Sequence, residues 1–316
     1  MSQGKVKDID LAILGAGIAG VSAAIYTKRA GLEFCIFEGG AVGGQLYLME
    51  QVDNYVGLNL GTKGRDLAQK LNEALCDLNI DVINEEVIRL EADKKRNILT
   101  VYTKECVYKA KCALIASGAS FKKLAVKGED EFLGKGVSYC AVCDGFFFKG
   151  KNVAVVGGGN TAVEEALYLS SIARKVILIH RKPQLRALDY LQKELAKKNN
   201  IELVLDSEVG EIKGSKLLEE VVVENIQSNK KQNISLEGLF IAIGVKPNTN
   251  LLSNIVTLDE GGFIITDEYM KTSSDFIWAA GDCRKRPLRQ LITAASEGAI
   301  AALSAYKYLK GYYISS

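Results

Sequence analysis

The chain has 316 residues, of which 48% are hydrophobic and 25% charged, a composition typical of a soluble globular protein of about two domains. Its 40 basic residues nearly balance its 38 acidic ones, so the net charge of +2 disfavours a nucleic-acid-binding or membrane-surface protein. No apolar run approaches the roughly 20 residues that a transmembrane helix needs. We therefore expect neither a nucleic acid nor a membrane among its partners.

The chain opens on a predicted dinucleotide-binding unit. A short apolar strand carries an acid, unlike a signal peptide, and runs into the glycine motif at residues 15–20. Gly15 allows a tight turn, Gly17 lets the backbone approach a pyrophosphate, and Gly20 allows close packing of helix on strand. Glu38 ends the next apolar strand, where a carboxylate can accept hydrogen bonds from ribose hydroxyls. The glycine pattern is weak alone, but with Glu38 it predicts a dinucleotide site.

The following segments predict the rest of this unit. Apolar residues at helical spacing predict a helix over residues 64–78. Alternating apolar and polar residues over 80–112 predict antiparallel strands packed beside a parallel sheet. An apolar strand over 113–118 ends in glycine and closes the unit.

Residues 140–145 read Cys-Ala-Val-Cys-Asp-Gly, and this motif carries the most chemistry in the chain. Two intervening residues let Cys140 and Cys143 form a small disulfide ring at the start of a helix. The helix dipole and neighbouring groups can then lower a thiol pKa from about 8.5 towards neutrality. Asp144 is placed to donate or accept a proton when the disulfide opens. The pattern predicts a redox-active dithiol.

A second glycine motif follows at Gly157, Gly159 and Ala162, after another β-branched strand. No acid ends the next strand; instead, it ends in His-Arg-Lys at 180–182, with Arg186 four residues beyond. Arginine side chains bind a 2′-phosphate with charge-assisted hydrogen bonds, whereas an acid would repel it. The second site is therefore expected to bind NADP(H) in preference to NAD(H).

The chain is thus a diverged internal repeat of two βαβ units. The second unit also ends in an apolar strand closed by glycine, at residues 240–244, and residues 201–226 echo the antiparallel strands of the first unit. An amphipathic helix is predicted over about 288–309. This tail belongs to neither repeat and must complete one of them.

The five other cysteines, at 35, 76, 106, 112 and 283, are interpreted as core or incidental thiols. Their odd total and irregular spacing do not match a secreted disulfide framework, and we expect a cytoplasmic protein. A zinc site would have to add Cys106 and Cys112 to the dithiol, because His180 is the one histidine. No metal site is expected.

Together these motifs resemble the bacterial-type, low-molecular-weight thioredoxin reductases over nearly the whole chain. The most specific stretches are residues 136–147, 153–166 and 180–182, and the pairs Gly281-Asp282 and Arg289-Gln290 match the family's flavin-binding pairs. The resemblance implies an α/β fold of two Rossmann-like domains, each with three layers, a parallel sheet and an antiparallel β-meander. It inserts an NADPH domain carrying the dithiol (119–247) into a discontinuous FAD domain (1–118 and 248–316).

The resemblance also assigns residues to the two cofactors. It places an FAD site at Gly15, Gly17, Ile18, Ala19, Gly20, Glu38, Gly39, Gly44, Gln45, Leu46, Asn54, Ala116, Gly118, Asp282, Arg289, Gln290 and Leu291. It places an NADPH site at Gly157, Gly159, Asn160, Thr161, Ala162, His180, Arg181, Lys182, Arg186, Ile243 and Gly244. Lys182 stands where a second arginine is usual in the family.

The implied activity passes electrons from NADPH through FAD and the Cys140–Cys143 disulfide to the disulfide of thioredoxin. By resemblance, Cys143 faces the flavin, Cys140 attacks thioredoxin, and Phe146 and Phe147 help to hold it. Family members are homodimers in which the NADPH domain swings, presenting first nicotinamide and then the dithiol to the flavin. On the residues alone, the aromatic run at 146–148 is interpreted first as core, with an exposed patch for docking a partner protein as the alternative.

Three other functions share part of this motif set with thioredoxin reduction. A flavoprotein that supplies a peroxiredoxin would need a separate carrier protein, because the chain begins at the first glycine unit. A ferredoxin–NADP reductase of similar fold would lack the dithiol. A non-enzymatic redox or zinc sensor would use the cysteine pair as a switch, and it would not be a yellow, flavin-containing protein.

Overall fold

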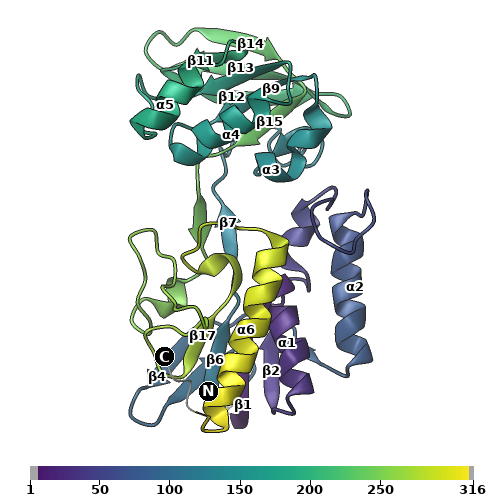
Figure 1. Ribbon diagram of the computed structural model, residues 1–316, viewed down its shortest axis with the longest axis vertical. Coiled ribbons are helices and arrows are strands. Elements are labelled where there is room, and N and C mark those ends of the chain that lie inside the picture. The colour runs from purple at the N-terminus through teal and green to yellow at the C-terminus, as the bar shows by residue number, and fades with distance from the viewer. Residues whose placement is uncertain (1–5, 313–316) are drawn as a thin grey trace. The chain divides into compact units, whose positions relative to one another are not determined.

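The computed structural model describes residues 6–312, which divide into two compact units (Figure 1). Of the described residues, unit 1 takes those up to Met49, Tyr55–Ser120 and those from Lys246 onward. Unit 2 takes Phe121–Val245 together with the short segment Glu50–Asn54. Most of unit 2 is therefore a single segment inserted within the chain of unit 1.

Unit 1 is built on a mixed sheet with the strand order β3-β2-β1-β6-β5-β4, and β17 pairs with β6. The strands β1, β2, β3, β6 and β17 run parallel, whereas β4 and β5 join antiparallel, which confirms the strands predicted within residues 80–112. The bounds are β1 (Val6–Leu14), β2 (Phe34–Phe37), β3 (Val82–Ile83), β4 (Arg89–Asp93), β5 (Ile98–Tyr102), β6 (Val107–Ile115) and β17 (Ile277–Ala279).

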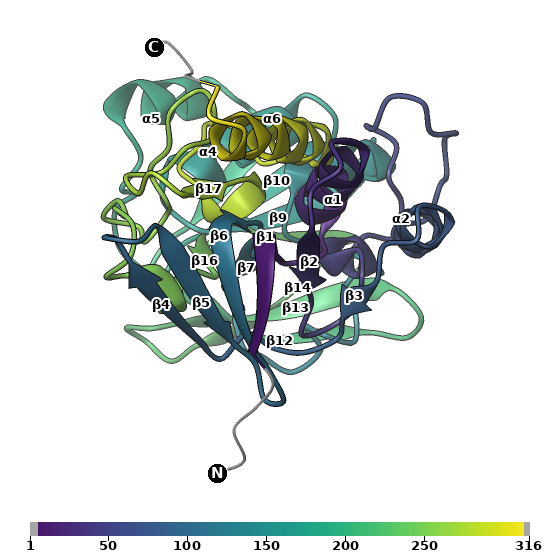
Figure 2. The same cartoon turned by 90° about the horizontal axis from the view of Figure 1, so that it is seen from below.

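Helices α1 and α6 lie side by side on the same face of this sheet (Figure 2). A Cβ on Gly298 of α6 would lie 2.1 Å from the carbonyl oxygen of Ala19, so glycine permits this close packing. The predicted C-terminal helix is confirmed, although it begins at Leu291. The helical segments are α1 (Ile18–Arg29), η1 (Gly44–Leu48), α2 (Gly64–Asp77), η3 (Asn250–Leu252), η4 (Gly281–Cys283) and α6 (Leu291–Leu309).

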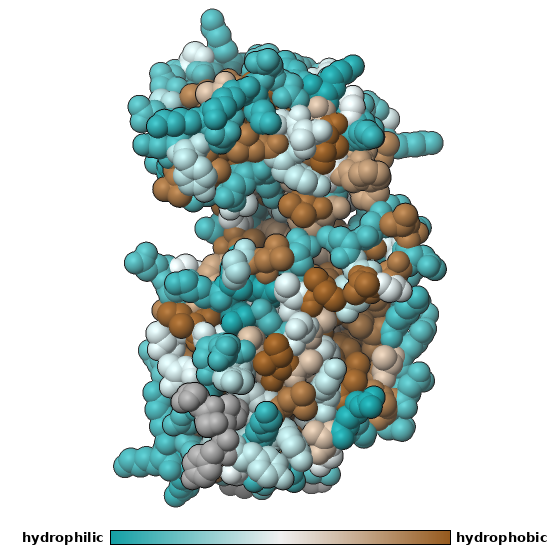
Figure 3. Space-filling model, viewed as in Figure 1, coloured by the Kyte–Doolittle hydropathy of each residue, from teal (hydrophilic) through white to brown (hydrophobic). Residues whose placement is uncertain are grey.

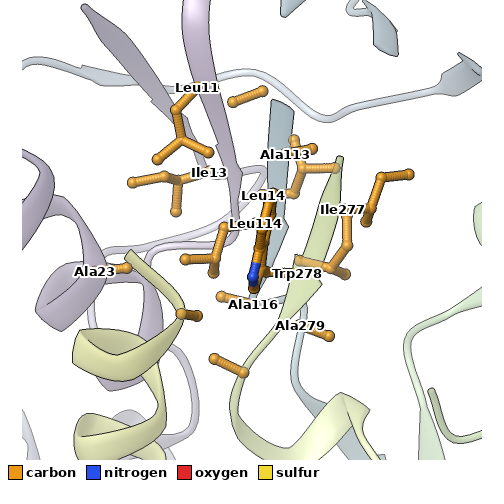
Figure 4. Close-up of a cluster of buried hydrophobic side chains, with 14 of the residues drawn as sticks. Leu11, Ile13, Leu14, Ala23, Ala113, Leu114, Ala116, Ile277, Trp278 and Ala279 are labelled. Carbon is orange, nitrogen blue, oxygen red and sulfur yellow. The ribbon is translucent and has the colours of Figure 1, made fainter. Parts of the chain in front are cut away.

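The core of unit 1 forms between its central strands and these helices. Figure 4 shows part of this buried cluster, with labelled side chains from β1, β6, β17 and α1 and with Trp278 among them. Trp278 is 1% exposed and its indole N–H donates a 2.8 Å hydrogen bond to Ser304 Oγ of α6. Burying so large an aromatic surface with its polar atom satisfied ties the C-terminal helix to the sheet. The tail thus completes the first unit.

Unit 2 has a parallel sheet of the order β11-β10-β9-β15-β8 and a separate antiparallel sheet, β12-β13-β14. Its strands are β8 (Val137–Ser138), β9 (Asn152–Val156), β10 (Lys175–Ile179), β11 (Ile201–Val204), β12 (Ser207–Gly214), β13 (Leu218–Asn225), β14 (Lys231–Ser235) and β15 (Gly238–Ile241). Its helical segments are α3 (Ala141–Asp144), η2 (Gly145–Phe148), α4 (Asn160–Ser170) and α5 (Asp189–Ala196).

One strand differs from its sequence-based assignment. Residues 201–204 were grouped with the antiparallel strands, but β11 pairs parallel with β10 and extends the nucleotide-type sheet. A short apolar run cannot show which neighbour a strand will pair with, because pairing is a tertiary property. The antiparallel meander begins at β12, three residues later.

The chain passes between the units through two short strands, β7 (Ala119–Phe121) and β16 (Val245–Pro247), which pair with each other. Each unit combines a parallel sheet, helices and antiparallel strands, so the predicted α/β fold class is confirmed. Within residues 6–312, none of the helices has both the length and the apolar composition needed to cross a bilayer.

Candidate active site

The first glycine turn has the geometry that the sequence motif requires. Gly15 has φ +107°, and a Cβ there would lie 2.4 Å from the carbonyl oxygen of Ala116. A Cβ on Gly20 would lie 1.8 Å from the carbonyl of Gly15, so helix and strand can approach this closely only without side chains. A Cβ on Gly17 meets no atom within 4 Å, which leaves open space at the start of α1.

Glu38 lies directly beside this turn. Its Oε2 accepts a 2.7 Å hydrogen bond from the Ala16 amide, and its Oε1 accepts one of 2.8 Å from Gly40. The Gly43 amide donates to the carbonyl of Ala16 at 2.8 Å, which brings the segment of η1 alongside. The structure thus gathers the glycine turn, the acid and residues 44–46 at one end of β1.

The C-terminal return adds Asp282 to the same region of unit 1. Gly281, with φ +77°, precedes it, and a Cβ there would lie 3.1 Å from the Cβ of Ala19. Burial raises the pKa of Asp282 above its ordinary value, although the cationic Arg286 and Arg289 oppose this. A carboxylate therefore stands next to the start of α1, far from it in the sequence.

Glu297 of α6 holds this turn in place. Its Oε2 accepts a 2.8 Å hydrogen bond from the Gly281 amide and lies 3.2 Å from Nη1 of Arg286. Its Oε1 pairs with Nη1 of Arg284 at 2.5 Å. The side chain of Arg286 is only 2% exposed, and it also lies 3.5 Å from Asp282. One carboxylate thus forms ion pairs with two buried cations.

We expect the substitution Glu297→Gln to lower the melting temperature of the protein. Breaking a buried ion pair costs roughly 3–5 kcal/mol, because the partner charges stay buried, and about 2–4 °C of Tm is lost per kcal/mol in a domain of this size. Differential scanning fluorimetry checks this against Glu268→Gln, a control at an exposed glutamate of unit 1. Equal melting temperatures in the two variants would contradict the role of Glu297.

The second glycine turn, in unit 2, is shaped by His180. Gly157 has φ +154°, and a Cβ there would lie 2.5 Å from the carbonyl oxygen of Ala242. A Cβ on Gly158 would lie only 2.3 Å from Cε1 of the His180 ring, so the imidazole occupies that space. Burial, with the nearby Arg186 adding to it, lowers the pKa of His180. We infer that His180 is a neutral support for the turn.

Cationic side chains gather beside this turn. The amide of Arg186 donates a 2.6 Å hydrogen bond to the carbonyl of Gly158, which fixes the segment after β10 against the glycines. The side chains of Arg181, Lys182 and Arg186 are all exposed. Asn160, the first residue of α4, accepts a 3.0 Å hydrogen bond from the amide of Leu188. The arrangement presents positive charge next to the N-terminus of a helix, a favourable setting for a phosphate.

The cysteine pair forms a disulfide on the same unit. Cys140 and Cys143 are bonded, with their Cα atoms 5.3 Å apart. Cys140 is the N-cap of α3, and its Sγ accepts a 3.2 Å hydrogen bond from the Cys143 amide. The predicted helix start is confirmed, but α3 has a single turn of four residues and passes into η2. Its dipole is therefore small, and neighbouring side chains decide the properties of the thiols.

Asp144 lies against the disulfide-bearing turn. Its Oδ2 accepts a 2.5 Å hydrogen bond from Ser138 Oγ, and Ser138 Oγ in turn accepts one of 3.0 Å from the Cys140 amide. Burial raises the pKa of Asp144, while the bond from Ser138 opposes the rise. The carboxyl group thus keeps its proton to a higher pH than an ordinary aspartate does, as a proton donor for a leaving thiolate requires.

The aromatic run after the motif divides into two parts. Phe148 is buried and packs edge-on against Phe240, with ring centroids 5.3 Å apart. Phe146 is 70% exposed and Phe147 37%, and Val142 beside them is 55% exposed. Apolar side chains are visible on the surface around α3 in Figure 3. The core and docking interpretations therefore apply to different residues of one run.

The remaining residues predicted for the FAD site lie in unit 1, except Asn54, whose segment groups with unit 2. Gln45 donates a 2.7 Å hydrogen bond to the Ala119 carbonyl, and Gln290 caps α6. The guanidinium of Arg289 lies 4.3 Å from the ring centroid of Phe263, and within residues 6–312 its buried Nε has no hydrogen-bond partner. The remaining residues predicted for the NADPH site, Thr161, Ala162, Ile243 and Gly244, all lie in unit 2.

Two glycine turns and a redox disulfide define a known class of proteins, and comparison with known families identifies it. The profile of the family described as "Pyridine nucleotide-disulphide oxidoreductase" matches residues 9–298. The chain belongs to the pyridine nucleotide-disulphide oxidoreductase family. Among the cysteines of residues 6–312, Cys140 and Cys143 are joined in a disulfide, whereas the other five are free thiols.

Relatives within the pyridine nucleotide-disulphide oxidoreductase family confirm the predicted resemblance to thioredoxin reductases. A thioredoxin reductase of Borreliella burgdorferi is 41% identical over 98% of this chain and 95% of its own length. A "34.2 kDa protein in rubredoxin operon" of Clostridium pasteurianum is also 41% identical, over 96% and 98%. The crystal structure of thioredoxin reductase from Streptococcus pyogenes is 39% identical, covers 96% of this chain and 99% of that one, and has a TM-score of 0.92.

Sequence reasoning missed several residues that organise this oxidoreductase. Glu297 and Arg286 hold the Gly281-Asp282 turn, Ser138 links Cys140 to Asp144, and Glu165 contacts α3 from α4. Ser138 and Glu165 lie within the specific stretches 136–147 and 153–166, but the motifs there gave these two residues no chemical role. The sequence offered only an acid or an arginine near a glycine motif as a signal for such residues. Charged residues of this kind are common on solvated helix faces, so the signal does not single them out.

Proposed function

We propose that this protein is a thioredoxin reductase, which passes electrons from NADPH through FAD and the Cys140–Cys143 disulfide to the disulfide of thioredoxin. One observation carries the proposal: a dithiol-competent disulfide lies in a nucleotide-binding unit, on a chain with a second such unit. Its similarity to thioredoxin reductases over nearly its full length supports the same activity.

The residues around the first glycine turn suit FAD, which we assign to ranges 1–118 and 248–316. Open space at Gly17 and Gly118 would admit the pyrophosphate, and Glu38 offers carboxylate oxygens to ribose hydroxyls. Asp282 would take the ribityl chain. The buried Nε of Arg289, which has no hydrogen-bond partner among residues 6–312, would be a donor for the isoalloxazine end. When bound, the flavin supplies the exchange of a hydride for two electrons at the disulfide.

We assign NADPH to unit 2, in the range 119–247. A Cβ on Gly159 meets no atom within 4 Å, so this glycine also borders open space at the start of α4. Arg181 and Arg186 would bind the 2′-phosphate of NADPH. The His180 ring, which fills the space beside Gly158, would support the shape of the glycine turn. These exposed cations lie in unit 2, where strand β10 is followed by basic residues. In unit 1 the equivalent strand, β2, is followed by the acid Glu38.

The protein's own residues manage the sulfur chemistry. Opening the disulfide takes two electrons and two protons, and Asp144 is placed to protonate one leaving sulfur. Ser138 holds both the Asp144 carboxyl and the Cys140 amide, so it keeps acid and sulfur in register. Cys140 would then attack thioredoxin through a mixed disulfide, while Cys143 resolves it.

Two surfaces fit the proposed partners. The exposed Val142, Phe146 and Phe147 beside the disulfide suit an apolar patch of thioredoxin. On unit 1, the exposed apolar residues Ile292, Ile300 and Leu303 of α6 suit the interface of a homodimer. The five other cysteines are free thiols, in keeping with a cytoplasmic location.

The test is disulfide reduction by the purified protein. We expect a yellow, flavin-containing protein that oxidises NADPH rapidly only when thioredoxin is added, with insulin or a chromogenic disulfide as the final acceptor. Omitting thioredoxin is the control. Equal NADPH oxidation with and without thioredoxin, or a colourless protein, would refute the proposed function.

A further inference from the structure

Glu165 of α4 is a half-buried glutamate beside the disulfide-bearing turn, and the proposed mechanism leaves it without a role. Its Oε1 accepts a single long hydrogen bond, 3.4 Å, from the amide of Ala141. Its Oε2 is buried, and within residues 6–312 it has no hydrogen-bond partner. Ala141 is the first residue of α3 and the neighbour of Cys140. A carboxylate with so little solvation is costly to keep charged.

The surroundings of Glu165 leave the cysteine motif as its titratable neighbour. Burial raises the pKa of Glu165 to about 7, and the bond from Ala141 only partly opposes this. Glu164 and Tyr168, on the same helix, are exposed. Strands β9 and β10 and helix α5 pack apolar side chains against α4, namely Val153, Val155, Val176, Leu178, Leu191 and Leu195. The helix α3, which packs against α4, carries Cys143 and Asp144 and has Cys140 as its N-cap.

A thiolate at Cys140 would share this poorly solvated region with the Glu165 carboxylate. Cys140 directly precedes the Ala141 amide that Glu165 binds, so negative charges on both groups would disfavour each other and the two would titrate as a coupled pair. The helix α3 has one turn and offers the thiolate little compensation. Whichever group holds the charge therefore decides the protonation of the other.

We propose that Glu165 is a positioning residue of the dithiol, whose charge controls whether the Cys140 thiol ionises. The step is a proton exchange with no electron transfer: the S–H bond of Cys140 breaks, an O–H bond forms on Glu165, and the pair keeps one negative charge. Uptake of a proton by Glu165 thus prepares the attacking thiolate. The inference rests on the proposed function for its use of the reduced dithiol.

The test measures thiol ionisation without NADPH or thioredoxin, so it is independent of the proposed substrate. The purified holoprotein is reduced with a phosphine, and the rate of Cys140 alkylation by iodoacetamide is followed by mass spectrometry across the pH range. In Glu165→Gln we expect the alkylation pKa of Cys140 to fall by about one unit, because the competing charge is removed. The control Glu208→Gln removes an exposed charge of unit 2 and should leave the profile unchanged.

A second variant guards against misfolding of the first. Ala141→Pro removes the amide that bonds to Glu165 while keeping the carboxyl group. Proline is tolerated at the first helical position, and Cys140, with φ −147° and ψ 102°, has the extended backbone that precedes proline. The carboxylate then loses its donor, so the pKa of Cys140 should fall in the same direction by less. An unchanged Cys140 profile in the folded variants, or an equal shift in Glu208→Gln, would overturn the proposal.

Discussion

Replacing Cys143 with serine abolishes thioredoxin reduction while leaving the flavin bound and reducible by NADPH. The single hydroxyl cannot form the Cys140–Cys143 disulfide, so electrons that reach the flavin have no sulfur pair to enter. Loss of a group that forms the covalent intermediate typically costs on the order of 10³-fold or more in rate. We expect thioredoxin turnover to fall by at least that factor, measured with NADPH and excess thioredoxin.

The flavin spectrum separates this effect from misfolding. In Cys143→Ser the visible absorption of the flavin should still disappear on anaerobic addition of NADPH. The matched control is Cys76→Ser, which changes an exposed free thiol of unit 1 and should keep full turnover. Retained thioredoxin turnover in Cys143→Ser would remove the disulfide from the mechanism.

The largest expected effect on cofactor use comes from the double substitution of Arg181 and Arg186 with alanine. Each hydrogen bond to a charged group contributes about 1.5–3 kcal/mol, and every 1.4 kcal/mol is about tenfold in affinity. We therefore expect the KM for NADPH to rise by on the order of 10²-fold or more. The KM for NADH should stay nearly unchanged, because NADH carries no 2′-phosphate, and the preference for NADPH would be lost.

Steady-state kinetics with both nucleotides checks this preference. Lys198→Ala is the control, since it removes an exposed cation of unit 2 outside the second glycine turn. If the double variant raised the KM for NADPH and NADH equally, the two arginines would support the shape of the site and would not read the phosphate. A partly retained preference would instead assign a share of the binding to Lys182, which carries charge without the bidentate geometry of arginine.

Short sequence patterns correctly predicted the features that depend on neighbouring residues: the glycine turns, individual helices and strands, and the disulfide. A glycine motif requires particular backbone angles within six residues, and both turns have them, with φ +107° at Gly15 and +154° at Gly157. The helix over 64–78 and the strands of β4 and β5 followed from hydrophobic periodicity. The disulfide followed from two cysteines separated by two residues. Each of these signals lies within one short stretch of chain.

The pairing of strands and the burial of the aromatic run depended on residues that are distant in the sequence. Whether residues 201–204 joined the parallel sheet or the meander depended on which strand offered a free edge. Whether the 146–148 run was core or surface depended on the position of Phe240, which buries Phe148 and leaves Phe146 exposed. The sequence could only state both possibilities, because a partner distant in the chain made the choice.

By itself, the sequence determined the class of chemistry: two glycine turns, a basic strand end and a Cys-x-x-Cys pair, each legible from neighbouring residues. Only the tertiary structure showed which glutamates, among the many in the sequence, contact the Gly281-Asp282 turn and the disulfide-bearing turn. Glu297 reaches the Gly281 amide and Glu165 reaches the Ala141 amide because helix packing brings them there. The charge, burial and pKa of such side chains are set by groups that folding collects from distant parts of the chain, and no short stretch of sequence records them.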